Sequence, residues 1–349
     1  MAVVKAEGYG HGGVPVARAA LEAGATWLGV CTIEEALELR AAGITAPMLS
    51  WLHLPDDDFA TAVRAGVDLS VASREHLAAV LAGARRVGRA ARLHLKVDTG
   101  LSRGGVQLDS WADLLDDAAK AAADGRAEVV AVWSHLAHAD APHHPTLDRQ
   151  AARLTAAWEA SRDRGWTPIR HLANSAATLT RPDLHFDLVR PGIAIYGLDP
   201  LGRPVTETPL RPAMTLRARV ALVKCVPAGE GVSYGHEWTT PSATTLALLP
   251  IGYADGVPRR LGRHGRMRVL LAGRSRPVVG RVCMDQVMVD CGDDPIREGD
   301  EAVLFGPGAQ GEPTAQDWAD ELGTIHYEVV TGVHGRRVHR TVVDEAGRR

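Results

Sequence analysis

Residues 2–13 of this chain read AVVKAEGYGHGG, a short β-branched run that ends at Lys5 and then breaks into a glycine-rich turn. Glycines in such a turn let backbone N–H groups approach an anion closely, because they carry no β-carbon. A lysine at the end of a strand is well placed to form a Schiff base. The stretch therefore predicts an enzyme that holds an aldehyde cofactor by its amine and its phosphate.

Lysine is rare in this chain, which makes Lys5 more informative. Of 39 basic residues only four are lysine, namely Lys5, Lys96, Lys120 and Lys224. Arginine fills nearly every position where a positive charge is sufficient, but it cannot replace an amine that must react, because the guanidinium stays protonated. Lys5 and Lys96 both fall at the ends of expected strands, so both are candidate reactive amines.

The composition excludes several classes of function. With 349 residues, 46% of them hydrophobic and 23% charged, the chain suits a large barrel plus a second domain. A net charge of −3 gives no reason to expect nucleic acid or an anionic membrane as a partner. No apolar run approaches ~18 residues, and no signal-peptide pattern is visible. Four cysteines without a CxxC pair suit a reducing compartment, so we expect a cytoplasmic protein.

The first two-thirds of the chain alternate between short apolar runs and amphipathic stretches. Alternating strands and helices imply a parallel sheet, and eight such strands imply a closed (β/α)8 TIM-type barrel, which we place at residues 1–205. The expected strands are 2–6, 27–32, 47–51, 68–73, 91–98, 128–136, 169–175 and 187–192. The expected helices between them are 14–23, 33–42, 57–65, 74–82, 111–123 and 146–164.

Polar and reactive side chains gather at the C-terminal ends of these expected strands. Barrel enzymes build their active sites at that end, and random placement would not favour one end over the other. The residues concerned are Lys5, Thr32, Trp51, Ser73, Lys96, His135, Asn174, Ser175 and Arg190.

After about residue 205 the pattern changes to strands broken by glycine and proline turns. The expected strands are 216–226, 243–251, 267–271, 277–289, 301–304 and 326–331, with one helix at 314–322. A mostly β C-terminal domain is therefore expected over residues 206–349.

Two other interpretations rest on single motifs. Residues 8–13 match the G-x-G-x-x-G dinucleotide fingerprint, with Glu34 and Glu35 about 20 residues on, which favours an NAD-dependent dehydrogenase. Against it, the acidic pair falls in the next helix, and a doubly wound sheet does not explain polar groups at eight strand ends. The histidines and aspartate within residues 135–144 resemble a metal cluster, but their spacing is irregular and no cysteine joins them, so we expect no metal.

The motifs also follow, in order, those of a known family. Val4-Lys5-Ala6 with Tyr9-Gly10-His11-Gly12 resembles the pyridoxal-phosphate lysine motif of alanine racemases, which have a barrel followed by a β domain. The other matching segments are 96–103, 134–140, 171–176, 189–198, 232–235, 251–256, 281–286 and 327–328. Nine segments in one order, spanning residues 4–328, carry the resemblance.

The resemblance implies a reaction that needs two acid/base groups, because racemisation removes a proton from one face of the substrate carbon and returns it on the other. It assigns Lys5 to one face and Tyr234 of the partner subunit to the other, in a homodimer that interconverts L- and D-alanine with pyridoxal 5'-phosphate. It places His135 and Arg190 as cations that favour deprotonated Tyr234. The expected role is the supply of D-alanine for peptidoglycan.

The resemblance also implies which residues bind the cofactor and the substrate. Arg190 faces the ring nitrogen, which stays unprotonated because arginine cannot accept a proton, so the cofactor is a weaker electron sink. The implied cofactor-binding residues are Lys5, Tyr9, His135, Ser175, Arg190, Gly192, Ile193 and Tyr327. Arg103 and the partner subunit's Met284 contact the substrate carboxylate region, and Lys96 carries a carbamate whose negative charge holds Arg103. Supporting or entrance residues are Tyr253, Asp140, His171 and Asp285.

Two further alternatives share parts of this site. A racemase or decarboxylase of the same fold for a larger amino acid would differ at Tyr253 and Tyr327, which narrow the entrance. A non-catalytic cofactor carrier would lack the β domain, and with it Tyr234 and Met284. The resemblance also implies a segment before the lysine strand, which the sequence lacks before Met1; we expect its absence to weaken folding and the dimer.

Overall fold

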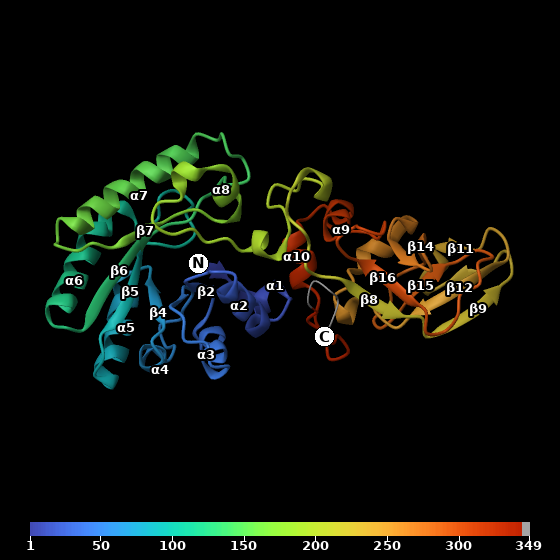
Figure 1. The fold of residues 1–349 in the computed structure, drawn as a ribbon, viewed down its shortest axis with the longest axis horizontal. Coiled ribbons are helices and arrows are strands. Elements are labelled where there is room, and N and C mark those ends of the chain that lie inside the picture. The colour runs from blue at the N-terminus through green and yellow to red at the C-terminus, as the bar shows by residue number, and fades with distance from the viewer. Residues whose placement is uncertain (344–349) are drawn as a thin grey trace. The chain divides into compact units, whose positions relative to one another are not determined.

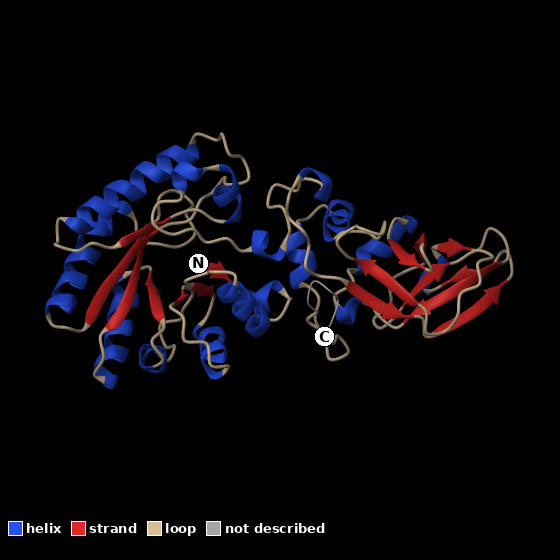
Figure 2. Cartoon of the chain, viewed as in Figure 1, coloured by secondary structure: helices blue, strands red, loops and turns tan. Residues whose placement is uncertain are grey.

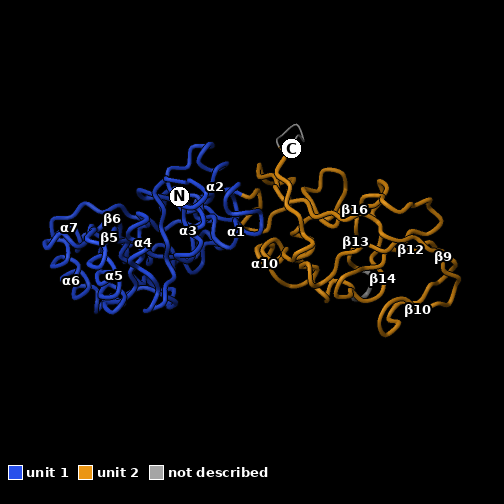
Figure 3. The backbone as a smooth tube through the Cα atoms, turned by 90° about the horizontal axis from the view of Figure 1, so that it is seen from below, with its two compact units in different colours: residues 1–195 blue, residues 196–349 orange. Residues whose placement is uncertain are grey.

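The computed structural model describes residues 1–343, with the side chains of residues 263–265 left out. The chain divides into two compact units, residues 1–195 and residues from 196 onward, shown in separate colours in Figure 3. No helix among the described residues is long and apolar enough to span a membrane.

The first unit is a curled parallel sheet of seven strands in sequential order, with every neighbouring pair parallel. Helices α5, α6 and α7 lie along the outer side of β4, β5 and β6 (Figure 1). The strands are β1 (Ala2–Val3), β2 (Leu28–Val30), β3 (Met48–Ser50), β4 (Asp68–Val71), β5 (Ala91–Lys96), β6 (Ala127–Trp133) and β7 (Ile169–His171). The helices are α1 (Lys5–Tyr9), α2 (Gly13–Glu22), α3 (Ile33–Ala41), α4 (Phe59–Arg64), α5 (Arg74–Val87), α6 (Trp111–Ala123), α7 (Thr146–Arg162) and α8 (Ser175–Thr180).

The expected eighth strand, 187–192, does not form, and this part of the prediction is wrong. Its backbone nevertheless bonds to both edges of the sheet: Arg190 N–H donates to Ala173 O at 2.9 Å, and Val3 N–H donates to Pro191 O at 3.0 Å. Pro191 has no N–H to donate, which prevents a regular ladder. The segment therefore bridges β7 and β1 as irregular chain.

Strand β5 shows how this sheet separates its two faces. Side chains of a strand alternate between faces, so Arg92, His94 and Lys96 share one face while Leu93 and Leu95 share the other. Both leucines are fully buried. His94 contacts His171 of β7, which is separated from β5 by β6, so the polar face points into the curl of the sheet.

The second unit contains a seven-stranded antiparallel sheet and a separate hairpin of β10 and β11 (Figure 2). The sheet order is β8-β16-β13-β14-β15-β12-β9. Because β8 and β9 follow each other in the chain yet lie at opposite ends of this order, the sheet must curl until its edges approach. The strands are β8 (Leu216–Arg219), β9 (Leu222–Val226), β10 (Gly231–Val232), β11 (Trp238–Thr239), β12 (Thr244–Leu249), β13 (Arg268–Leu271), β14 (Arg274–Val279), β15 (Val287–Asp290) and β16 (Glu301–Phe305).

The mostly β character of this unit is confirmed, but its last element was predicted wrongly. Residues 326–331, expected as a strand, form helix α10 (His326–Thr331), which packs against α9 (Ala315–Leu322). Val329, Val330 and Thr331 favour a strand by propensity. The buried positions His326, Val329 and Val330 lie three and four residues apart, which is a helical spacing.

Candidate active site

The chain after Lys5 adopts a left-handed turn. Ala6, Glu7, Gly8 and Tyr9 all have φ between 52° and 58°. Left-handed backbone costs roughly 1–2 kcal/mol for each residue other than glycine. Such strain persists only where surrounding structure enforces it, and it gathers at functional sites. The turn therefore makes Lys5 a candidate functional position.

Glu35 of α3 anchors this turn from outside. Its carboxylate accepts from Ala6 N–H at 2.7 Å and from Cys31 N–H at 2.6 Å, while its own backbone N–H bonds to Thr32 in a capping box. A charged acceptor makes such bonds stronger than neutral ones. The same carboxylate therefore stabilises both the N-terminal cap of α3 and the turn that follows Lys5.

Tyr9, Ser175 and Gly192 meet at one place in the first unit. A β-carbon at Gly192 would overlap the Tyr9 hydroxyl and stand 2.9 Å from its ring carbon Cζ, so only glycine fits there. Ser175 Oγ accepts from Gly192 N–H at 2.8 Å and from Ala194 N–H at 3.3 Å. Ile193 begins the next 3₁₀ turn. Two hydroxyls and a run of amides therefore converge, as an anion cradle requires.

Arg190 is buried, and its guanidinium makes four hydrogen bonds. Its guanidinium donates to the carbonyls of Ser134 at 2.9 Å and Leu172 at 3.1 Å, and to Nδ1 of His171 at 3.0 Å and of His135 at 3.2 Å. Burial lowers the pKa of Arg190 to about 9, which still leaves it cationic at neutral pH. These hydrogen bonds hold the guanidinium, and its positive charge, in one position and orientation.

His135 stands where the predicted cations of the first unit meet. Burial lowers its pKa well below the usual value, and the charges of Arg190, Arg103, Lys96 and Lys5 lower it further. His135 is therefore neutral at neutral pH. The resemblance implied two cations here, His135 and Arg190, but only Arg190 carries a positive charge.

Lys96 lies against an aromatic ring in a partly enclosed position. Its Nζ is 4.5 Å from the centroid of Trp133, and Gly104 of the following loop passes close to it. Burial, then the charges of Arg103 and Arg190, lower the pKa of Lys96 to about 8. At pH 7 roughly a tenth of such amines are neutral, against fewer than about one in a thousand for an ordinary lysine.

The structure adds residues that sequence reasoning missed. Cys31 follows β2, and the charges of Lys5 and Lys96 both act on its thiol, whose pKa burial raises. His94 and Asp68 are buried in the sheet interior and bond to each other at 3.2 Å. The alternation of Arg92, His94 and Lys96 between leucines could have indicated this polar interior face.

Three turns of the second unit that carry predicted residues pack together. Ser233 Oγ donates to Arg281 O at 2.8 Å, and Tyr253 N–H donates to Cys283 O at 3.1 Å, so these three turns pack together. They present three exposed side chains: Tyr234 at 70%, Met284 at 53% and Tyr253 at 39%.

The remaining predicted residues lie in supporting positions. Asp285 accepts a hydrogen bond from Arg337 at 2.9 Å. Arg337 also donates to the buried Asp255, at 2.6 Å. Tyr327 is half-buried on α10 and stacks on His326. Asp140 is exposed on the loop between β6 and α7.

Neither single-motif alternative fits the fold. Of the fingerprint glycines, Gly8 lies in the left-handed lysine turn, Gly10 caps it and Gly13 begins α2. The sheet runs in sequential order without the reversal that a dinucleotide-binding sheet has. Among the side chains that the structure describes, no group of three or more from His, Cys, Asp and Glu is arranged to hold a metal ion. His138 and His144 instead stack on each other, with ring centroids 3.9 Å apart.

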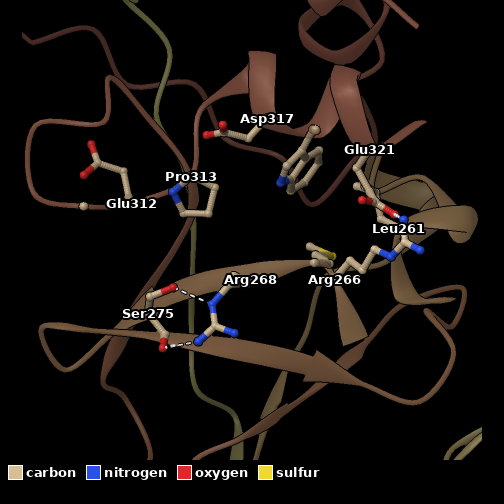
Figure 4. A pocket seen from close by; sticks show the side chains of 11 residues that line it. Leu261, Arg266, Arg268, Ser275, Glu312, Pro313, Asp317 and Glu321 are labelled. Carbon is tan, nitrogen blue, oxygen red and sulfur yellow. Dashed lines mark hydrogen bonds and ion pairs between the residues drawn. The ribbon is translucent and has the colours of Figure 1, made fainter. Parts of the chain in front are cut away.

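A separate cavity of about 250 Å³ lies in the second unit beside α9 (Figure 4). It contains none of the predicted residues. Its charged groups are engaged locally: Arg268 bonds to Ser275, Arg266 to Glu321, and Glu312 to backbone amides. It is not the candidate site.

Together these features define a two-part class of protein, in which a helix-covered parallel sheet bears a lysine at a strained turn and an antiparallel unit follows it. Family models of the alanine racemase N-terminal and C-terminal domains match residues 1–200 and 213–342. The alanine racemase of Salinispora tropica is 59% identical over 341 residues, covering 97% of this chain and 91% of the relative. The chain is an enzyme of the alanine racemase family.

Solved structures agree with this assignment. The alanine racemase of Streptomyces coelicolor has a TM-score of 0.94 at 51% identity, covering 99% of this chain and 91% of that one. The alanine racemase of the D-cycloserine-producing Streptomyces lavendulae has a TM-score of 0.93 at 52% identity, covering 96% and 88%.

Proposed function

We propose that this chain interconverts L- and D-alanine, with pyridoxal 5'-phosphate as its cofactor. One observation carries the proposal: the strained turn that presents Lys5 also carries Tyr9 into the cradle formed by Ser175 and Gly192. The amine and the anion cradle are therefore fixed to each other by four residues of backbone. This is what a cofactor with both an aldehyde and a phosphate needs.

The residues present fit that cofactor. Tyr9, Ser175 and the amides of Gly192 and Ile193 would hold the phosphate, with Tyr327 added by family resemblance. Arg190 would face the ring nitrogen as a donor that cannot accept a proton. When bound, the cofactor supplies the electron sink that acidifies the α-proton of the amino acid.

The two faces of the substrate carbon need separate acid/base groups. Lys5 would move the proton on one face, and Tyr234 of the partner subunit on the other. Arg190 donates to Nδ1 of His135, so the proton of this neutral ring is on Nε2. That N–H would donate to the tyrosine oxygen and favour its deprotonated form, which replaces the expected imidazolium with a hydrogen bond.

Lys96 and Arg103 would form the anchor for the substrate carboxylate, beside the partner subunit's Met284. A carbamate forms from a neutral amine and carbon dioxide, and the lowered pKa of Lys96 provides that amine. The resulting anion would hold Arg103, whereas a protonated Lys96 would repel it.

The expected biological setting is a cytoplasmic homodimer that supplies D-alanine for peptidoglycan. A panel of amino acids tests the substrate against the main alternative, a larger amino acid. Purified protein with pyridoxal phosphate is incubated with each L-amino acid, and the D-enantiomer is measured by chiral chromatography. Alanine should be converted fastest. Faster conversion of a larger amino acid would contradict the proposed substrate.

The cofactor is tested separately. The protein should show the visible absorption of bound pyridoxal phosphate, and Lys5→Ala should lose both this band and racemisation. Lys120→Ala is the matched control, because Lys120 is an exposed lysine on α6. Binding of a nicotinamide cofactor without that visible band would overturn the assignment.

A further inference from the structure

A continuous row of polar side chains crosses the interior of the first unit, from the site to the opposite end of the sheet. Arg190 Nη1 lies 3.0 Å from His171 Nδ1, and His171 Nε2 lies 3.0 Å from His94 Nδ1. His94 Nε2 lies 3.2 Å from Asp68 Oδ2, and Arg92 Nε lies 2.7 Å from Asp68 Oδ1. Both histidines are fully buried and Asp68 is 1% exposed.

The proton on each nitrogen of this row follows from its ends. Arginine can only donate, so Nδ1 of His171 accepts and its proton is on Nε2. That N–H donates to Nδ1 of His94, whose own proton is then on Nε2 and donates to Asp68. Burial lowers the pKa of both histidines, so each ring carries a single proton.

Two further contacts keep the row in place. Trp133 stacks on His171, with ring centroids 5.3 Å apart and planes 15° apart, and its N–H donates to Ser70 Oγ at 3.2 Å. Asp68 is the first residue of β4, at the end of the sheet remote from Lys5 and Lys96. The direction of all three hydrogen bonds is thus held at one end by Arg190 and at the other by a carboxylate far from the chemistry.

We propose that Asp68 and His94 are positioning residues for Arg190. They fix the tautomer of His171, so Nδ1 of that ring remains an acceptor for the guanidinium and the guanidinium keeps its orientation. The effect on catalysis rests on the proposed function, whereas the tautomers do not. Residues at the amino end of barrel strands usually serve stability, so a loss of activity alone would not separate the two roles.

Asp68→Asn is the discriminating variant because it changes one atom. Arg92 Nε donates to Oδ1 at 2.7 Å, whereas Arg92 Nη2 reaches Oδ2 only at 3.5 Å, so the amide oxygen of the variant should stay at the Oδ1 position and its NH₂ should take the position of Oδ2. That NH₂ would donate to His94 Nε2, which moves the proton of His94 to Nδ1. The same reversal at His171 would point an N–H at Arg190 and force the guanidinium to turn away.

The experiment reads nitrogen-15 chemical shifts of histidine side chains in the cofactor-loaded protein, since protonated and unprotonated ring nitrogens differ in shift. His94 and His171 should be Nε2–H tautomers in the parent and Nδ1–H tautomers in Asp68→Asn. Glu128→Gln is the matched control: it removes the exposed partner of Arg92 and should leave both tautomers unchanged.

A second variant serves if Asp68→Asn does not fold. His94→Phe keeps a ring but removes both nitrogens, so His171 should become a mixture of tautomers. Turnover should fall about tenfold to a hundredfold in either variant. Unchanged His171 shifts in both variants would overturn the proposal, even if activity falls. Correct tautomers in a parent that does not racemise alanine would instead overturn only the proposed function.

Discussion

The two units differ in how far their candidate site residues are buried and bonded. In the first unit, Arg190 and His135 are buried or half-buried, bonded to each other and shifted in pKa. In the second unit, Tyr234 and Met284 are among the most exposed large apolar or aromatic side chains. The candidate residues of the first unit are bonded within that unit, whereas those of the second are exposed.

This difference indicates a division of work. The buried half is preorganised: its charges are fixed before any ligand arrives, which reduces the reorganisation that a reaction requires. Among the residues that the structure describes, no hydrogen bond or ion pair fixes the side chains of Tyr234 and Met284. The exposed half suits residues that become ordered only against another surface, as the proposed exchange of Tyr234 between subunits requires.

The largest expected effect tests that exchange. Lys5→Ala and Tyr234→Phe should each lower racemisation at least a hundredfold as homodimers. If each site combines both units across a dimer, mixing the two variants creates hybrid dimers with one intact site. An equal mixture should then recover about a quarter of parental activity, because half of the dimers have one working site of two.

Activity is measured after dissociation and reassociation of the mixture, with the unmixed variants treated in the same way as controls. A mixture no more active than its components would show that both residues must come from one chain. Tyr234→Phe should also impair the two directions unequally, because it removes the group on one face only.

The next effect concerns the cradle. Gly192→Ala should weaken binding of pyridoxal phosphate by about tenfold or more, because the new β-carbon overlaps Tyr9 and displaces a group within a preorganised site. Gly13→Ala is the control, since a β-carbon there would meet its neighbours only at 3.9 Å. Equilibrium dialysis measures both. Equal affinities of the two variants would remove Gly192 from the cradle.

The pH dependence of Lys96 gives a smaller, graded effect. Its pKa is lowered to about 8, so the neutral amine increases as the pH rises through 8 and decreases below it. At fixed dissolved carbon dioxide, carbamate occupancy should therefore rise between about pH 7 and 9. Carbon-13-labelled carbon dioxide should give a carbamate resonance that is absent in Lys96→Met. A resonance that falls with rising pH would contradict this assignment.

Much of the fold and site was predictable from the sequence, because strand ends and periodicity are local signals. Lys5 and Lys96 lie at the C-terminal ends of β1 and β5, as this basis predicted, whereas Arg190 lies on the irregular segment 187–192 and not on a strand. The two-residue spacing of β5 also contained Arg92 and His94, but reading it required knowing that this face points inward. The contacts of His94 are with Asp68 and His171, which lie 26 and 77 residues away in the sequence, so no local pattern reports them.

Other features depended on tertiary contacts that no local pattern reports. The left-handed turn contradicts the local preference of Ala6, Glu7 and Tyr9, and it is held by Glu35 of α3. The segment of α10 reads as a strand by its β-branched residues, and packing against α9 decides otherwise.

The smallest expected effect comes from a comparison of two similar helix N-caps, one in each unit. Thr32 and Thr314 each form a capping box, one at α3 of the first unit and one at α9 of the second. Replacing either by alanine should cost about 1 kcal/mol of unfolding free energy, measured by denaturant titration.

Only the first cap should also affect cofactor binding. Thr32 orients Glu35, which holds the lysine turn through Ala6, whereas the partner of Thr314 is Asp317, which caps α9 alone. Thr32→Ala should therefore weaken binding of pyridoxal phosphate severalfold while Thr314→Ala leaves it unchanged. If both variants lost the same affinity, the effect would reflect global stability, and the link from the helix cap to Lys5 would be wrong.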